Sequence, residues 1–221
     1  MTSDKIKAIL DQMATLNEQL LSLTDDMLLE IDPRDNESLQ QGLAFITAFN
    51  LSHEKYTDAA DELEKQIKQY FQVDPEEEEV ETETANSKGK IIKELDKTQP
   101  YSLDHSFCYK RPYGFVLGDT ACKGIKTWKS LYLRLLGEMS KRDMKRFIKM
   151  ADAKEFVTRR GNPLFSSSPD NLRNSVDLPG GIYAEINLSA DGIVANIKQV
   201  LVFFGLPQES LKLYLREDRN G

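Results

Sequence analysis

Apolar residues near the N-terminus recur with the spacing of a coiled-coil helix. The steps between them alternate between three and four residues through three heptads, at Ile6, Ile9, Met13, Leu16, Leu20, Leu23 and Met27. Steps of this size return each side chain to one stripe of a helix. We therefore expect a long first helix that packs through this stripe. Leu10 and Leu21 widen the stripe, which favours packing on two sides.

The pattern over residues 32–71 predicts two more helices. Asp32 is suited to cap a second helix and Pro33 to occupy its first position, and the apolar pattern continues to about Asn50. A break at residues 50–53 then precedes a third helix that ends near Phe71. Three such helices either close into a bundle within one chain or pair with a second copy. Because narrow stripes leave the flanks of a helix uncovered, we favour a homodimer held by residues 1–72.

The next segment is dominated by charge rather than by apolar periodicity. Residues 73–84 contain a run of glutamates, and residues 86–90 add small and polar side chains. Such a block repels itself and has little to bury. We expect residues 73–99 to form an acidic flexible linker between two domains.

From about residue 100 the pattern changes to short apolar runs separated by turn residues. Residues 113–117, the turn Gly118-Asp119 and residues 120–127 predict a β-hairpin. Thr127 and Ser140 are suited to cap two successive helices. The first of these helices has one broad apolar face, formed by Trp128, Leu131, Tyr132, Leu135, Leu136 and Met139.

The remaining pattern predicts two more strands, one helix and a last strand. Residues 182–187 alternate as a strand, Ser189 caps a helix that Gly205 ends, and residues 211–215 alternate again. The order lacks repeated βαβ units, which disfavours a doubly wound parallel sheet. The predicted class is α+β. An N-terminal helical, coiled-coil region over residues 1–72 precedes a small domain over residues 100–221 with a mixed or antiparallel sheet.

Charge divides the chain in the same way as the apolar pattern. The 221 residues have a net charge of −7. Residues 1–100 carry 23 acidic and 10 basic side chains, whereas residues 101–221 carry 13 acidic and 19 basic ones. The excess is largest in residues 101–160, with 14 basic and 6 acidic side chains. This division indicates two parts with different partners.

The helix expected after Ser140 places its basic side chains on one stripe. They follow the spacing i, i+3, i+4, i+7, opposite an apolar side of Met144, Phe147, Ile148 and Ala151. Aligned cations of this kind bind phosphates without reading sequence, although a solvated helix face is the alternative interpretation. The candidate nucleic-acid-binding residues are Arg142, Lys145, Arg146, Lys149, Arg159, Arg160, Lys126 and Lys129, with Lys123 as a possible extension.

Residues that could carry catalysis are few. Asp104, His105 and Cys108 lie close in sequence but within no nucleophile motif, and Asp119 and Glu185 could meet only through the fold. No phosphate-binding glycine loop and no CxxC pair is present. The two cysteines, Cys108 and Cys122, are interpreted as reduced thiols in or near the core. We therefore expect no catalytic residue, metal or cofactor, and a protein that is not an enzyme.

Targeting signals are missing from the sequence as well. The N-terminus has no basic patch followed by an apolar block, and no apolar run approaches the ~18 residues of a membrane span. We expect a cytoplasmic protein with no membrane partner.

Four segments of the C-terminal half resemble those of a known protein module. They are residues 115–119, 128–131, 163–166 and 181–190. Over residues 112–217 the chain resembles a poorly characterised bacterial C-terminal α+β module found in mobile-element and restriction or defence-associated proteins. The resemblance implies a bacterial or phage origin and an accessory role near nucleic-acid-processing systems. It supplies no catalytic residue.

Together these observations predict a non-enzymatic DNA- or RNA-binding accessory or regulatory protein, dimerising through its N-terminal helices. The alternative is a protein-interaction adaptor or inhibitor whose basic face binds an acidic protein.

Overall fold

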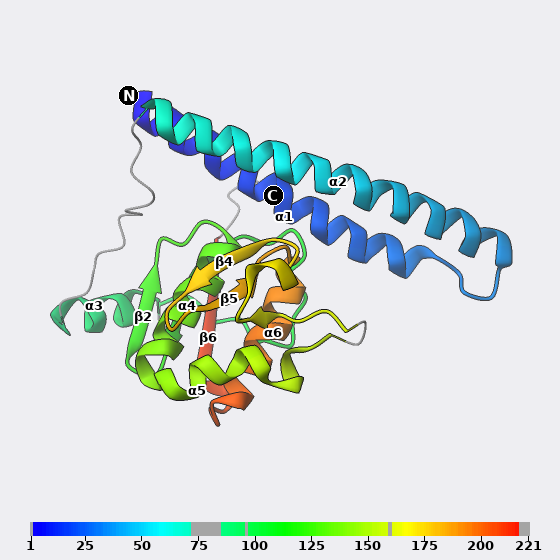
Figure 1. Ribbon diagram of the computed structural model, residues 1–221. Coiled ribbons are helices and arrows are strands. Elements are labelled where there is room, and N and C mark those ends of the chain that lie inside the picture. Colours follow the sequence, from blue (N-terminus) through cyan, green and yellow to red (C-terminus); the bar gives the residue numbers. More distant parts are fainter. Residues whose placement is uncertain (1, 72–84, 96, 159–160, 217–221) are drawn as a thin grey trace. The chain divides into compact units, whose positions relative to one another are not determined.

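The computed structural model describes residues 2–71, 85–95, 97–158 and 161–216 (Figure 1). The chain divides into two compact units, Met1–Glu78 and Glu79–Gly221. The first unit is helical, and all described strands belong to the second. The α+β class predicted from the sequence is confirmed.

The first unit is a hairpin of two long helices, α1 (Thr2–Glu30) and α2 (Asn36–Phe71), which run side by side in Figure 1. The turn between them is held by carboxylates. Asp32 Oδ1 accepts the Arg34 N–H at 2.9 Å, and Asp35 Oδ1 accepts the Glu37 N–H at 3.1 Å. The helix therefore begins after Asp35, and the predicted cap at Asp32 is wrong because that carboxylate closes the turn instead.

The predicted break at residues 50–53 is also wrong, because α2 continues through it as one helix. Ser52 Oγ donates to the Ala48 carbonyl at 3.0 Å, and this bond to the preceding turn leaves the helix intact. His53 lies in a polar layer between the two helices: its Nε2 is 2.9 Å from Asn17 Oδ1, and Thr57 Oγ1 donates to the same oxygen at 3.2 Å. Over residues 2–71 of the first unit, the structure thus has two helices where the sequence predicts three.

The predicted stripe of α1 is buried only in part, and residues outside it also contact α2. Asn17 of α1 meets His53, and Ile31 lies against Gly42, where an added Cβ would be 2.5 Å from Ile31 Cγ1. Of the predicted heptad positions, Ile6 is buried, but Ile9 is 50% and Leu16 is 45% exposed. Two positions of the predicted stripe therefore lie on a flank that α2 does not cover.

The predicted acidic linker contains a helix. Residues 73–84 lie outside the described residues, but α3 (Ala85–Leu95) falls within the segment expected to be flexible. Its Ile91 and Leu95 are 2% and 1% exposed, in a small cluster with side chains of the neighbouring sheet: Val116, Ala121 and Tyr214. The two buried side chains make α3 part of the C-terminal unit, so the prediction of a flexible segment is wrong for residues 85–95.

The described strands form two three-stranded sheets, and all their pairings are antiparallel. The first sheet has the order β2-β1-β6, with β1 (Pro112–Leu117), β2 (Thr120–Lys123) and β6 (Leu211–Leu215). The second has the order β3-β5-β4, with β3 (Phe165–Ser166), β4 (Ser175–Leu178) and β5 (Ile182–Glu185). The predicted hairpin at Gly118-Asp119 is confirmed by the β1–β2 pairing.

Helices α4 (Trp128–Arg142) and α6 (Ala190–Phe203) each contribute six buried residues to the larger hydrophobic core of the C-terminal unit. The predicted caps are confirmed: Thr127 Oγ1 accepts the Ser130 N–H at 3.1 Å, and Ser189 Oγ accepts the Gly192 N–H at 3.2 Å. All six residues of the predicted apolar face of α4 are buried. Trp128 anchors this face, and its Nε1 donates to the Lys110 carbonyl at 2.7 Å.

In the described part of the chain, no helix combines the length and the apolar character needed to cross a membrane.

Candidate polyanion-binding surface

The basic segment after α4 is not the single amphipathic helix that the sequence predicts. Helix α4 continues through Ser140, whose Oγ donates to the Gly137 carbonyl at 2.8 Å, and ends at Arg142. Asp143, with φ −152° and ψ 87°, breaks the helix and caps the five-residue α5 (Met144–Ile148) by accepting the Arg146 N–H at 2.9 Å. A 3₁₀ turn, η1 (Lys149–Asp152), follows. The predicted cap at Ser140 is wrong because Asp143 takes that role.

The two arginines of the predicted stripe bind backbone carbonyls. Arg142 Nη2 donates to the Leu117 carbonyl at 3.0 Å, beside the β1–β2 turn. Arg146 Nη1 donates to the Phe204 carbonyl at 2.9 Å, at the C-terminal end of α6. A cation there complements the helix dipole. Each arginine thus joins its segment to another element, a structural role that the sequence analysis did not predict.

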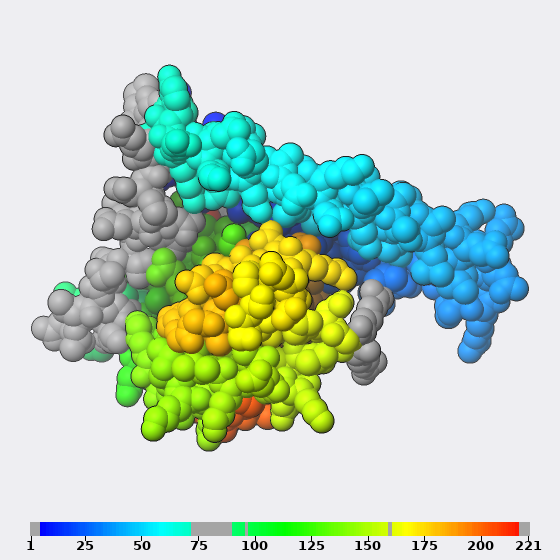
Figure 2. Space-filling view, viewed as in Figure 1, coloured from blue at the N-terminus to red at the C-terminus, as the bar shows by residue number. Residues whose placement is uncertain are grey.

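The two lysines of the stripe are differently placed. Lys145 and Lys149 are exposed, and no carboxylate of the described residues lies within ion-pair distance of either. Two carboxylates of the same segment are bound to other cations: Glu138 Oε1 is 2.6 Å from Lys141 Nζ, and Asp143 Oδ2 is 3.9 Å from Arg146 Nε. The name α4–η1 surface is used here for five cations: Lys141, Arg142, Lys145, Arg146 and Lys149. The segment that carries them is yellow-green in Figure 2.

The apolar side of this segment is partly as predicted. Phe147 and Met150 are fully buried and fix the segment to the core. Met144 and Ile148 are 39% and 41% exposed, but they lie against Gly180, where an added Cβ would be 2.7 Å from Ile148 Cγ1. The buried side chains hold the lysines on the outside of the unit.

The predicted binding residues near the start of α4 lie apart from this surface. Lys126 precedes α4 and Lys129 lies in its first turn, and the 12 residue steps from Lys129 to Lys141 rise about 18 Å along the helix. Lys123 Nζ is bound to Glu94 Oε2 of α3 at 2.7 Å. Arg159 and Arg160 lie outside the described residues.

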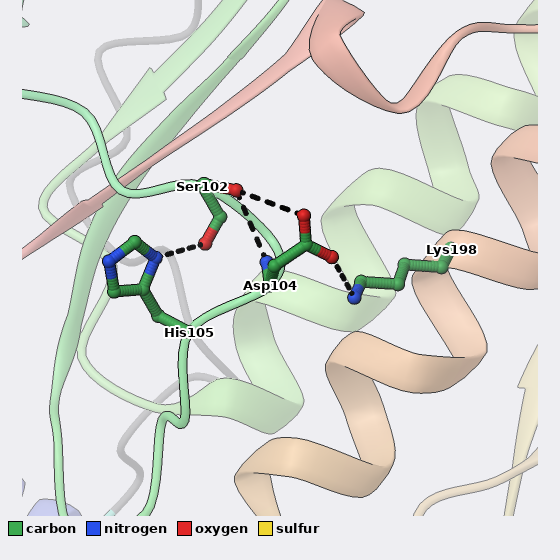
Figure 3. Close-up of polar contacts among 4 residues, drawn as sticks. All are labelled: Ser102, Asp104, His105 and Lys198. Carbon is green, nitrogen blue, oxygen red and sulfur yellow. Dashed lines mark hydrogen bonds and ion pairs between the residues drawn. The ribbon is translucent and has the colours of Figure 1, made fainter.

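The residues considered for catalysis do not converge. Asp104 Oδ1 is paired with Lys198 Nζ at 2.8 Å, and this hydrogen bond and charge hold the pKa of the Asp104 carboxyl below its usual value (Figure 3). His105 Nδ1 is 3.2 Å from the Ser102 carbonyl oxygen. Cys108 Sγ lies 3.4 Å from Asp191 Oδ2. The bonds of Asp104 and His105 thus lead to Ser102 and Lys198, whereas that of Cys108 leads to Asp191.

Glu185 has a structural role that the sequence analysis did not assign. Its carboxylate is buried, and it accepts backbone N–H groups from Arg173 at 2.7 Å, Asn174 at 3.3 Å and Asn187 at 2.8 Å. The carboxylate thus fixes the residues that precede β4 to those that follow β5. Within the described ranges, Asp119 and Glu185 join no group of side chains that could hold a metal ion.

Asp191 is another residue that the sequence analysis missed. It lies in the first turn of α6 and accepts hydrogen bonds from Ser106 Oγ at 3.0 Å and from the Phe107 N–H. These contacts fix the loop before β1 to the helix. The contacting residues are more than 80 positions apart in the sequence, so no local sequence pattern could predict these contacts.

Comparisons of the chain with protein-family models, with curated proteins and with solved structures gave no match in any of the three.

Proposed function

We propose that this protein is a non-enzymatic accessory protein that binds nucleic acid through phosphate contacts of the α4–η1 surface. The observation that carries the proposal is the placement of Lys145 and Lys149. Both are exposed, and neither has a carboxylate of the described residues at ion-pair distance. Five cations against the three carboxylates of Glu138, Asp143 and Asp152 leave the surface positive, which favours a polyanion.

The two tethered arginines support the same function. A guanidinium has five N–H donors, so the bond of Arg142 to Leu117 and that of Arg146 to Phe204 leave donors for a ligand. Each group keeps its charge while its side chain is already ordered. Less conformational entropy is then lost on binding a phosphate than with a freely rotating side chain.

Binding through phosphates is expected to weaken steeply as salt is raised, because bound counterions are released from the nucleic acid. The proposal is tested by fluorescence anisotropy with a labelled duplex and a labelled single strand. The variant K145E/K149E is compared with K55E/K65E, which changes the net charge equally on exposed lysines of α2.

We expect K145E/K149E to bind about tenfold or more weakly, and the slope of log K against log salt to fall by about 1.5 for the two lost contacts. K55E/K65E is expected to bind as the wild type does. Equal affinities of the two variants, or a wild-type affinity that does not depend on salt, would exclude the proposed surface.

We further propose that two copies associate through the first helix, which would double the phosphate contacts of one particle. The supporting observation is the exposure of Ile9 and Leu16, which belong to the heptad pattern but lie outside the contact with α2. A second copy would cover them. Sedimentation velocity should find a dimer for the wild type and a monomer for I9S/L16S. The matched variant L51S/L63S, which replaces exposed leucines of α2, should remain dimeric. A monomeric wild type would contradict this proposal.

A further inference from the structure

The closed end of the helical hairpin carries a hollow of about 540 Å³. Its apolar lining comes from both helices and the turn between them: Met27, Ile31, Gly42, Phe45 and Ile46. Phe45 is 53% exposed, although its ring stacks on Phe49 with the centroids 6.2 Å apart. An aromatic side chain so far exposed on the wall of a hollow is available to a ligand.

The charged residues that line this hollow are all acidic. Glu30, Asp35 and Glu37 contribute the charged part of the lining, and no lysine, arginine or histidine lines it. The surrounding residues 25–38 add three more carboxylates, those of Asp25, Asp26 and Asp32, and only one cation, Arg34. The hollow therefore combines an apolar floor with an anionic rim.

The geometry of this end is fixed by local contacts. An added Cβ at Gly42 would lie 2.5 Å from Ile31 Cγ1, so only glycine lets Ile31 approach α2 this closely. Asp35 caps α2 through the Glu37 N–H, and Glu37 Oε1 accepts Gln41 Nε2 at 3.1 Å. These bonds hold two of the rim carboxylates beside the hollow before any ligand arrives.

We infer that the hollow is a docking site for a cationic amphipathic helix of a partner protein. Charge complementarity selects this occupant: its leucine-like side chains fill the space against Phe45 and Ile31, and its lysines or arginines face the carboxylate rim. A second copy of this chain is disfavoured as the occupant, because it would bring a second anionic hairpin end against the first. The site is distinct from the α4–η1 surface and does not depend on nucleic-acid binding.

The test uses the full chain and a fluorescein-labelled amphipathic peptide of about 18 residues, built from leucine and lysine only. A second peptide has the same leucine positions with glutamate in place of lysine. Anisotropy titrations are run at about 50 mM and about 300 mM salt. We expect the lysine peptide to bind more weakly at the higher salt concentration, and the glutamate peptide to bind at least tenfold more weakly than the lysine peptide.

Variants separate this site from the general negative charge of the hairpin. E30K/E37K and F45S are each expected to weaken binding of the lysine peptide about tenfold. The matched variants E54K/D58K and L51S, which change exposed residues farther along α2, are expected to change it less than twofold. K145E/K149E should bind the peptide as the wild type does. Far-UV circular dichroism checks that each variant keeps its helices.

Three results would overturn the inference. One is equal binding of the two peptides, and another is an equal effect of E30K/E37K and E54K/D58K. The third is self-association of the wild type that F45S abolishes, because a second copy would then be the occupant.

Discussion

The helical hairpin and the C-terminal unit differ in how completely they bury their apolar residues. In the C-terminal unit, large side chains such as Phe115, Leu135 and Phe147 have no exposed surface. In the hairpin, the most buried apolar side chains of the described residues, Ile6 and Ile46, each remain 8% exposed, and Leu29 is 84% exposed. The C-terminal unit therefore closes its own core, whereas the hairpin leaves several large apolar side chains exposed.

The polar contacts within the two units also differ. In the hairpin, the layer of Asn17, His53 and Thr57 crosses the contact between the helices, and such a layer fixes their register. In the C-terminal unit, Asn196 Nδ2 donates to the Tyr132 hydroxyl at 2.6 Å, and burial raises the pKa of Tyr132 well above its usual value. The polar layer of the hairpin replaces part of an apolar core, whereas the Tyr132–Asn196 contact lies within one.

The largest expected difference is in core truncation. Leu135→Ala in the C-terminal unit should lower the free energy of unfolding by about 2–5 kcal/mol, because the fully buried side chain leaves a cavity. Leu63→Ala, which removes the same atoms from a side chain 48% exposed on α2, should cost less than about 1 kcal/mol. Urea denaturation of the full chain measures both. Similar losses in the two variants would break the comparison.

Removing the charge of the buried Glu185 carboxylate should have the second-largest effect on the free energy of unfolding. Glu185→Gln keeps the shape but removes the charge that three backbone N–H groups face, so we expect a loss of about 1.5–3 kcal/mol. Asp104→Asn removes an exposed ion pair with Lys198 and should leave the urea midpoint unchanged. An unchanged midpoint in the Glu185 variant would show that the carboxylate does not hold the strands.

Glycine-to-alanine substitutions compare how well each unit accommodates an added methyl group. Gly180 has φ +89°, and an added Cβ would meet Ile148 Cγ1 at 2.7 Å, so Gly180→Ala should cost about 1–3 kcal/mol. Gly181, with φ +74° and open space around it, serves as the control, and alanine there should cost about 1–2 kcal/mol for the backbone alone. In α2, an added Cβ at Gly42 would lie 2.5 Å from Ile31 Cγ1, so Ile31 must shift, and this cost offsets the gain of about 1 kcal/mol in helix propensity. Thermal melts should rank Gly180→Ala as the most damaging of the three.

The pH dependence of the hairpin should be the smallest effect. Burial lowers the pKa of His53 below 6.5, so the folded hairpin favours the neutral ring. The unfolded chain then binds more protons, and this contribution to stability is full above about pH 6.5 and is lost as the pH falls toward the folded pKa. The helical melting temperature should drop between about pH 7.5 and about pH 5.5. His53→Gln should remove this part of the drop and His105→Gln should retain it; an equal drop in all three proteins would contradict the assignment.

Local sequence signals predicted the elements whose start or end depends on neighbouring residues. Thr127 and Ser189 cap the helices expected of them, and Gly118-Asp119 turns the expected hairpin, because each of these contacts forms within a few residues. The prediction failed where two local signals competed. Asp35 rather than Asp32 caps α2, and Asp143 rather than Ser140 begins α5, and spacing alone could not choose between such neighbours.

The candidate site was predicted in composition but not in geometry. The charge count located the basic segment, but the predicted stripe of cations assumed one continuous helix from Ser140 to Ala151. The break at Asp143 ended that helix, and Arg142 and Arg146 turned to carbonyls of Leu117 and Phe204. Those acceptors lie 25 and 58 residues away in sequence, so no pattern within the segment could reveal them.

The sequence by itself determined the α+β class, the long N-terminal helices and the charge division between the two halves. Periodicity, caps and charge are properties of neighbouring residues, and they act before the chain has folded. The tertiary structure decided which stripe of α1 meets α2, the burial of α3 and of Glu185, and which cations stay exposed to a ligand. These outcomes depend on contacts between distant residues, because a side chain becomes buried, paired or exposed only when another part of the chain comes to lie beside it.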